Sequence, residues 1–155
     1  MKKFILILIG GLLLTSCASK SNFHSFYKTN KSEADFSINA PPFFVNVFVP
    51  NEDLGEYKDL IKNVRKYKIM TFSKENEKLE RNFRKFIRNG NYASVLKVNE
   101  DGEKVDIYFL NEGDSIKEII LRVKSNDEYV LLGLKTNLLK KELNTFLNNS
   151  VAEVH

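Results

Sequence analysis

The residue types that most often catalyse reactions or bind metals are scarce in this chain and poorly placed for either role. There is one cysteine, Cys17, and there are two histidines, His24 and His155. His24 lies in a polar segment and His155 is the last residue, so neither is expected to be oriented by a folded scaffold. A metal ligand or a general base needs such orientation. We interpret both histidines as solvent-exposed and predict no metal site.

The acidic and hydroxyl side chains do not point to catalysis either. Paired carboxylates can act as acid and base when burial raises the pKa of one of them. The acidic groups here lie in predicted hairpin turns, where they are expected to be solvated, and no histidine or lysine signature surrounds Ser73 or Ser94. There is also no glycine-rich phosphate loop. We therefore expect a protein that is not an enzyme and has no cofactor. The acidic groups are Glu100, Asp101 and Glu103, and Glu112 with Asp114.

The position of Cys17 explains the single thiol. Two lysines precede an apolar stretch, FILILIGGLLL, which is shorter than the about 20 residues that span a bilayer. Together with a small-residue exit, these are the parts of a secretory signal peptide, here residues 1–16. The residues LTSC resemble the lipobox of bacterial lipoproteins, in which the cysteine is acylated, with palmitate among the chains, and becomes the N-terminus. The resemblance implies that Cys17 anchors the chain in a lipid bilayer. The alternative is an ordinary signal peptide with a chance cysteine.

The residues after Cys17 bear on location. Ala18 and Ser19 follow, with no aspartate at the next position, which resembles lipoproteins passed to the outer membrane. The acidic run that marks some surface-exposed lipoproteins is absent from ASKSN. We expect an outer-membrane lipoprotein that faces the periplasm, where it meets no nucleic acid.

The rest of the chain is long enough for one domain. The mature chain carries 22 basic and 20 acidic residues, so its net charge is +2 rather than +4. Residues 17–33 are polar and indicate a flexible tether, although Phe23, Phe26 and Tyr27 are unusual for a spacer. These aromatics are expected to dock on the domain, with insertion into the membrane interface as the alternative. The domain is predicted over residues 34–149 and a short tail over 150–155.

Hydrophobic periodicity and turn signals predict the elements of the domain. Strands are expected at 34–40, 67–72, 92–98, 104–110, 116–124 and 128–135. Helices are expected at 41–49 and 55–65, between Ser73 and Gly90, and after Asn137. The Asp101-Gly102 pair is a hairpin signal between two of the strands. The fold class is α+β: an antiparallel sheet with a C-terminal four-strand meander and helices packed on one face.

Alternation along the strands separates two faces of the sheet. We assign one face to the helices and expect the other to be wet, with Tyr108, Ile120 and Tyr129 forming a candidate interaction face among charged residues. The alternative is that a helix or the tail covers this face. The helix-facing residues are expected to be Val105, Ile107, Phe109, Ile119, Leu121 and Val123, and the charged residues of the wet face are Lys104, Asp106, Glu118, Arg122 and Lys124.

The charges are segregated along the chain. Residues 58–88 carry eleven basic and four acidic residues. Five of the basic residues recur at helical spacing and form a candidate anion-docking stripe: Lys74, Lys78, Arg81, Lys85 and Arg88. It could dock anionic phospholipid, an acidic glycan or an acidic protein, or it could be an ordinary solvated helix face.

Two resemblances complete the reading of the sequence. Asp114-Ser115-Ile116 resembles the O-glycosylation pattern of some envelope proteins, which implies a possible sugar on Ser115. The succession FRKFIRNGNYASVLKV, DGEKVDIYFL, IKEIILRV and EYVLLGLKTNLLKKEL resembles a family of small lipoproteins catalogued as domain of unknown function four-two-five-two. That resemblance covers residues 34–148 and implies an α+β fold and an exported location, without a catalytic motif.

We therefore expect a non-enzymatic cell-envelope lipoprotein that acts as a binding or adaptor module in the periplasm, its protein partner unidentified. The alternative is a structural lipoprotein that docks on membrane or glycan through the basic helix at 74–88.

Overall fold

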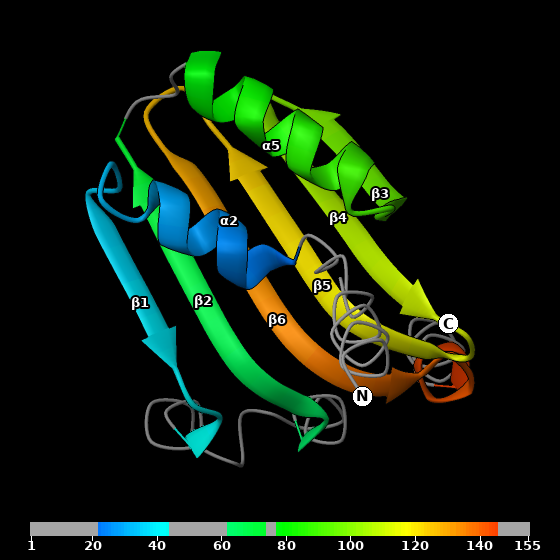
Figure 1. Ribbon diagram of the computed structural model, residues 1–155. Helices are drawn as coiled ribbons and strands as arrows, with labels where there is room; N and C mark the ends of the chain where they lie inside the picture. The colour runs from blue at the N-terminus through cyan, green and yellow to red at the C-terminus, as the bar shows by residue number, and fades with distance from the viewer. Residues whose placement is uncertain (1–21, 44–61, 74–76, 146–155) are drawn as a thin grey trace, which may run out of the picture.

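The computed structural model describes residues 22–43, 62–73 and 77–145 as a six-stranded antiparallel sheet with helices α2 and α5 across one face (Figure 1). The strands are β1 (Phe36–Ala40), β2 (Val64–Phe72), β3 (Ala93–Glu100), β4 (Glu103–Glu112), β5 (Ser115–Lys124) and β6 (Tyr129–Leu139). Their order in the sheet is β1-β2-β6-β5-β4-β3. The predicted α+β class with an antiparallel sheet is confirmed, and β3 to β6 form the predicted meander.

The β3–β4 hairpin turns where the sequence predicts it. Asp101 and Gly102 have φ angles of 50° and 86°, the left-handed conformation of a two-residue hairpin turn. This turn sets the register that places Lys97 opposite Asp106 and Asn99 opposite Lys104. It therefore fixes which charged side chains share a face at this end of the sheet.

Helix α5 (Glu77–Asn89) is the helix predicted between Ser73 and Gly90. Leu79, Phe83 and Phe86 form its buried face, as the spacing predicts. The helix ends where the Gly90 N–H donates to the Phe86 carbonyl at 2.9 Å. Because its apolar face lies on the sheet, its charged residues point outwards or toward the pocket described below.

Helix α2 (Phe23–Asn30) replaces part of the expected tether. Asn22 caps it by accepting from the Ser25 N–H at 3.1 Å. Phe23, Phe26 and Tyr27 are buried in the same core as α5, and the rings of Phe26 and Phe86 are 4.9 Å apart. The prediction of a flexible tether is wrong for this stretch, whereas the docking of the three aromatics is confirmed.

A close approach of α2 to the sheet explains one glycine. A Cβ added at Gly133 of β6 would lie 1.9 Å from Cδ1 of Phe23, so the ring rests directly on the strand backbone. Beside it, the Phe23 N–H donates to the Glu118 carboxylate at 3.0 Å, and the Tyr92 hydroxyl donates to the same oxygen. A carboxylate at a helix N-terminus is stabilised by the helix dipole, so this contact fixes the end of α2 on β5.

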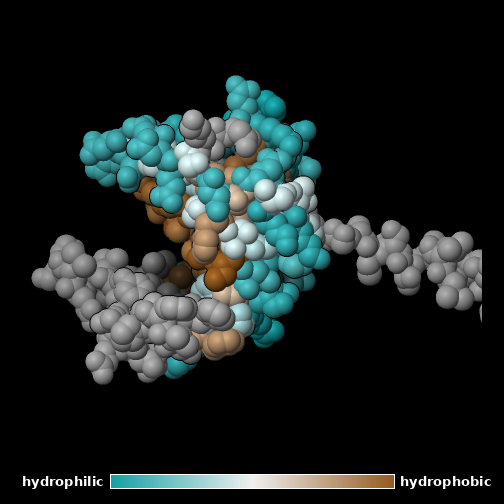
Figure 2. All heavy atoms as spheres, turned by 90° about the vertical axis from the view of Figure 1, so that its left-hand side faces the viewer, coloured by the Kyte–Doolittle hydropathy of each residue, from teal (hydrophilic) through white to brown (hydrophobic). Residues whose placement is uncertain are grey.

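The structure reverses the predicted faces of the sheet. Tyr108, Ile120 and Tyr129 lie under the helices at 7%, 0% and 0% exposure, so the predicted interaction face is the core. The prediction failed because β5 is apolar on both sides. The alternation of apolar and polar residues along the strand therefore does not indicate which side the helices cover. The residues assigned to the helices are instead on the open side of the sheet and partly exposed: Val105, Ile107, Phe109, Ile119, Leu121 and Val123. Figure 2, viewed onto the β1 edge, shows apolar side chains gathered on the side away from the helices.

Two further predicted elements differ from the structure. β6 continues to Leu139, so Asn137 lies in a strand and the following helix begins only at Lys140. β2 begins at Val64, which shortens the helix predicted at 55–65. Most of that helix, the helix predicted at 41–49 apart from residues 41–43, the signal peptide and the tail at 150–155 lie outside the described residues. Within the described residues, no helix is long and apolar enough to cross a membrane.

Candidate functional site

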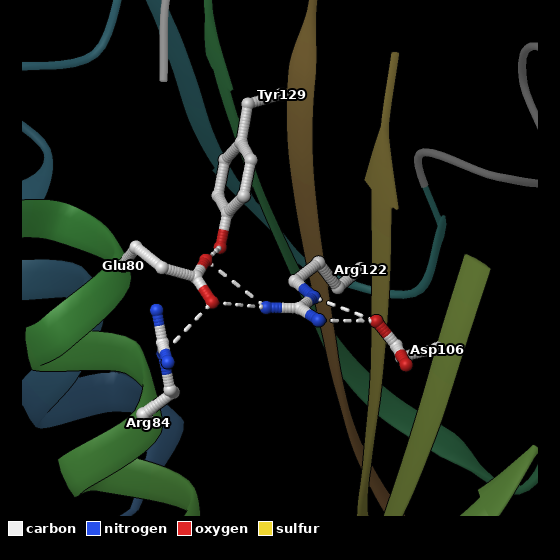
Figure 3. Close-up of polar contacts among 5 residues, drawn as sticks. All are labelled: Glu80, Arg84, Asp106, Arg122 and Tyr129. Atoms are coloured by element: carbon white, nitrogen blue, oxygen red, sulfur yellow. Dashed lines mark hydrogen bonds and ion pairs between the residues drawn. The ribbon is translucent and has the colours of Figure 1, made fainter. Parts of the chain in front are cut away.

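A buried ionic cluster lies between α5 and the sheet, centred on Arg122 of β5 (Figure 3). Its Nη1 donates to both carboxylate oxygens of Glu80 on α5, at 2.9 and 3.0 Å. Its Nε and Nη2 donate to Oδ2 of Asp106 on β4, at 2.8 and 2.5 Å. The guanidinium also lies 5.3 Å from the centre of the Phe83 ring. Three elements therefore hold a single arginine in one orientation.

Because these side chains are buried, each charge in the cluster depends on the opposite charge beside it. The side chains of Arg122, Glu80 and Asp106 are 14%, 13% and 8% exposed. Burial opposes the charge of Arg122, but its hydrogen bonds to Asp106 and the charge of Glu80 raise its pKa above the ordinary value, so it stays charged. Burial, followed by the charge of Glu80, raises the pKa of Tyr129, whose neutral hydroxyl donates to Glu80 at 3.4 Å.

A cationic pocket of about 390 Å³ opens beside the cluster. Glu80 is the only carboxylate among the lining residues, and burial raises the pKa of Tyr108, so its hydroxyl is a neutral donor. Lys104 and Lys124 stand directly opposite one another on β4 and β5. Like charges in that position destabilise a sheet unless something neutralises them. The residues that line the pocket are Glu80, Arg84, Lys97, Lys104, Tyr108, Arg122 and Lys124.

The pocket is suited to binding an anion. Five of its lining side chains are cationic, and Arg84 reaches it from α5 while bonded to Glu80 at 3.1 Å. Neither Lys97 nor Lys104 forms an ion pair with another described residue. Counting Asp106 behind Arg122, five positive charges face two negative ones, which leaves a net charge of +3. Over residues 22–43, 62–73 and 77–145, no group of three or more potential metal ligands occurs.

Comparison with known proteins gives a family. Residues 26–146 match the family described as Domain of unknown function (DUF4252). The chain belongs to the DUF4252 family. No curated protein and no solved structure shows a significant match to it. The match includes most of α2, which agrees with the packing of this helix into the DUF4252 domain.

The candidate anion-docking stripe of this DUF4252 domain is only partly available. Lys78 binds Glu33 at 2.9 Å, and Arg81 binds Glu77 at 3.2 Å. Lys85 and Arg88 are exposed on α5. Lys74 lies outside the described residues. The Lys78–Glu33 pair is an exposed contact between α5 and the segment after α2.

The remaining predicted positions are dispersed. Ser115 is the first residue of β5, opposite Glu112, and is partly exposed. His24 is exposed on α2, as predicted, but within a folded helix rather than a tether. Cys17 and His155 lie outside the described residues.

The sequence predicts that several pocket residues of the DUF4252 domain share one face of the sheet, but it does not predict the pocket itself. Alternation places Lys104, Asp106, Arg122 and Lys124 on one face, and the structure confirms that they share it. The missing information was that α5 covers only the middle of this face, where Tyr108 and Ile120 are buried, and leaves the Lys104 and Lys124 end open. Arg84 was missed because it lies beside the stripe rather than on it.

Proposed function

We propose that this protein is a non-enzymatic, lipid-anchored binding module of the cell envelope whose domain binds an anionic group in the cationic pocket. The observation that carries the proposal is the gathering of five cationic side chains around one open pocket with a single lining carboxylate. Concentrating like charge has an energetic cost that a bound anion relieves. A phosphate or another group with several anionic oxygens could contact cationic side chains from three strands together.

The rigid part of the pocket favours binding over chemistry. Arg122 is fixed by Asp106 and Glu80, so it can offer a pre-oriented charge at the pocket floor without being free to move. Tyr108 is a neutral donor, because burial raises the pKa of its hydroxyl. The lining holds no histidine, serine or cysteine that could pair with a base as a nucleophile. These groups fit recognition of an anion better than its conversion.

The location in this proposal comes from the sequence. The LTSC lipobox supports acylation of Cys17, and Ala18-Ser19 supports outer-membrane sorting with the domain in the periplasm. In that compartment the ligand could be free, or it could be part of an envelope molecule or a protein partner, which would make the domain an adaptor. Glycosylation of Ser115 is compatible with its partial exposure.

The second candidate function is docking on membrane or glycan through the basic helix at 74–88. Lys85 and Arg88 favour it, because both are exposed on the outer side of α5. Lys78 and Arg81 count against it, since each is already bonded to a glutamate. The pocket is the stronger candidate because three of its cations come from different strands and converge on one space.

Titration with pyrophosphate tests the pocket. The acylated protein in neutral detergent micelles would be labelled for NMR, and the amides of Lys97, Lys104 and Lys124 would be followed. We expect saturable shifts there, and about tenfold weaker binding in Lys97→Gln/Lys104→Gln, which corresponds to the loss of about 1.4 kcal/mol. Lys85→Gln/Arg88→Gln is the matched control, since it also removes two charges, and it should bind as the wild type does.

Either of two results would overturn the assignment. Equal weakening in both variants would show that net charge alone attracts the anion. Weakening only in the Lys85/Arg88 variant would favour the basic helix instead.

A further inference from the structure

A second cationic surface, separate from the pocket, lies where α2 meets β2 and β6. Lys66 of β2 stands directly opposite Lys135 of β6, and Lys68 follows two residues along β2, opposite Gly133. His24 and Lys28 lie one turn apart on α2. Burial and then the charges of Lys68, Lys28, Lys66 and Lys135 lower the pKa of His24. The positive charges of all four lysines therefore act on the His24 imidazole. We call these four lysines the α2 lysine cluster.

The described part of the protein balances the charge of the cluster only in part. None of its four lysines forms an ion pair with another described residue. Glu118 stands opposite Lys135, and its charge favours the charged form of Lys68, so the four lysines face this carboxylate with an excess of positive charge. The protein therefore places lysines opposite one another across two strands, an arrangement that is unfavourable by itself.

The position of the cluster relative to Cys17 indicates what neutralises it. Only six residues lead from Cys17 to Phe23, so the first residue of α2 can lie at most about 20 Å along the chain from the anchored cysteine. Lys66, Lys135 and Lys28 are exposed around this helix and can contact headgroups, whereas Lys68 is buried and contributes only its charge. An anionic bilayer attracts basic residues within about a Debye length of its surface. The anchor therefore keeps this surface within reach of phospholipid headgroups.

We propose that the α2 lysine cluster is the membrane-facing surface of the domain and binds the headgroups of anionic phospholipids. This proposal rests on acylation of Cys17 in the proposed function, and it adds an orientation. Lys135 stands opposite Glu118 in the strand register, and Glu118 is six residues along β5 from Lys124 in the pocket. That separation is about 20 Å along the strand. With the cluster on the bilayer, the cationic pocket is held off the membrane, open to the aqueous space.

Paramagnetic NMR in lipid nanodiscs tests this orientation. The acylated protein would be placed in discs of phosphatidylcholine, with or without phosphatidylglycerol, containing a trace of lipid with a gadolinium-chelating headgroup. In discs with phosphatidylglycerol, we expect broadening of the amides of Lys66, Lys68 and Lys135, and much weaker broadening at Lys97 and Lys104. In pure phosphatidylcholine the difference between these two regions should shrink.

Two variants make the test specific. Lys66→Gln/Lys135→Gln changes only exposed residues and should remove the effect of phosphatidylglycerol, whereas the pocket variant Lys97→Gln/Lys104→Gln should retain it. Equal broadening at both ends of the sheet, or an unchanged pattern in the Lys66/Lys135 variant, would overturn the proposal.

Failure of the anchor is distinguished by the mass of the purified protein. If Cys17 carries no acyl chains, co-sedimentation with vesicles becomes the measurement. The cluster then predicts binding to phosphatidylglycerol vesicles that falls roughly tenfold or more in Lys66→Gln/Lys135→Gln, because each basic residue near the surface adds about fivefold. No loss of binding in that variant would refute the cluster independently of the anchor.

Discussion

Substitution of Gly133 by alanine should show how tightly α2 is held on the sheet. The added Cβ would lie 1.9 Å from Cδ1, 2.3 Å from Cε1 and 2.5 Å from Cγ of Phe23. An ordinary carbon contact is about 3.5 Å, so the ring has to retreat by about 1.5 Å. Phe23 is only 3% exposed and packs against Phe26 and Phe86 at 6.0 and 6.1 Å between ring centres, which leaves little room for that shift.

The expected cost follows from this overpacking. Forcing an extra methyl group into a filled core costs about 1–3 kcal/mol, whereas alanine in place of glycine in an unstrained position stabilises by about 0.4–1 kcal/mol. We expect the steric cost to dominate and Gly133→Ala to lower the free energy of unfolding by about 1–2 kcal/mol in urea denaturation.

A double-mutant cycle with Phe23→Ala separates the proposed clash from other effects. Phe23→Ala alone should cost about 3–5 kcal/mol, because it removes a buried ring. In its presence Gly133→Ala should cost almost nothing, since the space above the strand is then empty. Additivity of the two changes within about 0.5 kcal/mol, or stabilisation by Gly133→Ala in the wild-type background, would refute the contact between α2 and β6 described here.

Two further predictions concern the charged groups. Arg122→Met should cost about 3–5 kcal/mol in urea denaturation, because it leaves the carboxylate of Asp106 buried without its partner and takes from Glu80 its buried cation. Exchanging all three for apolar residues of similar size should recover most of that loss, and no recovery would show that the loss does not come from unpaired carboxylates. The backbone N–H and the side chain of Ser73 hydrogen-bond Asp35 and hold its pKa below 3.8. The stability that Asp35 adds is therefore present above pH 3.8 and lost as the pH falls through its lower folded pKa. The destabilisation caused by Asp35→Asn should accordingly vanish in acid. A carboxyl NMR titration that gives an ordinary pKa for Asp35 would contradict this.

Local sequence signals predict most of the sheet and α5. The alternating strands, the Asp101-Gly102 turn and the spacing of Leu79, Phe83 and Phe86 depend on neighbours along the chain, so they are readable without the fold. Helix α2 was not predicted because an eight-residue helix is not stable by itself. It forms because Phe23, Phe26 and Tyr27 find a core to enter, and only their unusual presence in a polar segment pointed to it.

The faces of the sheet and the location of the sites depend on contacts that the sequence does not display. Ile119, Ile120 and Leu121 are consecutive and apolar, so β5 gives no preference for either face. The face that the helices cover is decided by contacts with helix side chains, including those of Glu80 with Arg122 and of Phe23 with Gly133. The pocket and the α2 lysine cluster both arise from strand register, because Lys104 faces Lys124 and Lys66 faces Lys135 only once the strands are paired.

The strand order β1-β2-β6-β5-β4-β3 also governs the order of assembly during synthesis. β3 to β6 pair with their neighbours in sequence, so each hairpin can close as soon as its second strand emerges. β2 joins this meander only through β6, whose residues Tyr129–Leu139 are delivered late. Until then β1 and β2 have no connection to the rest of the sheet, and Gly133 is not yet there to receive the ring of Phe23. Helix α2 thus acquires its place on the domain only when nearly the whole chain has been delivered.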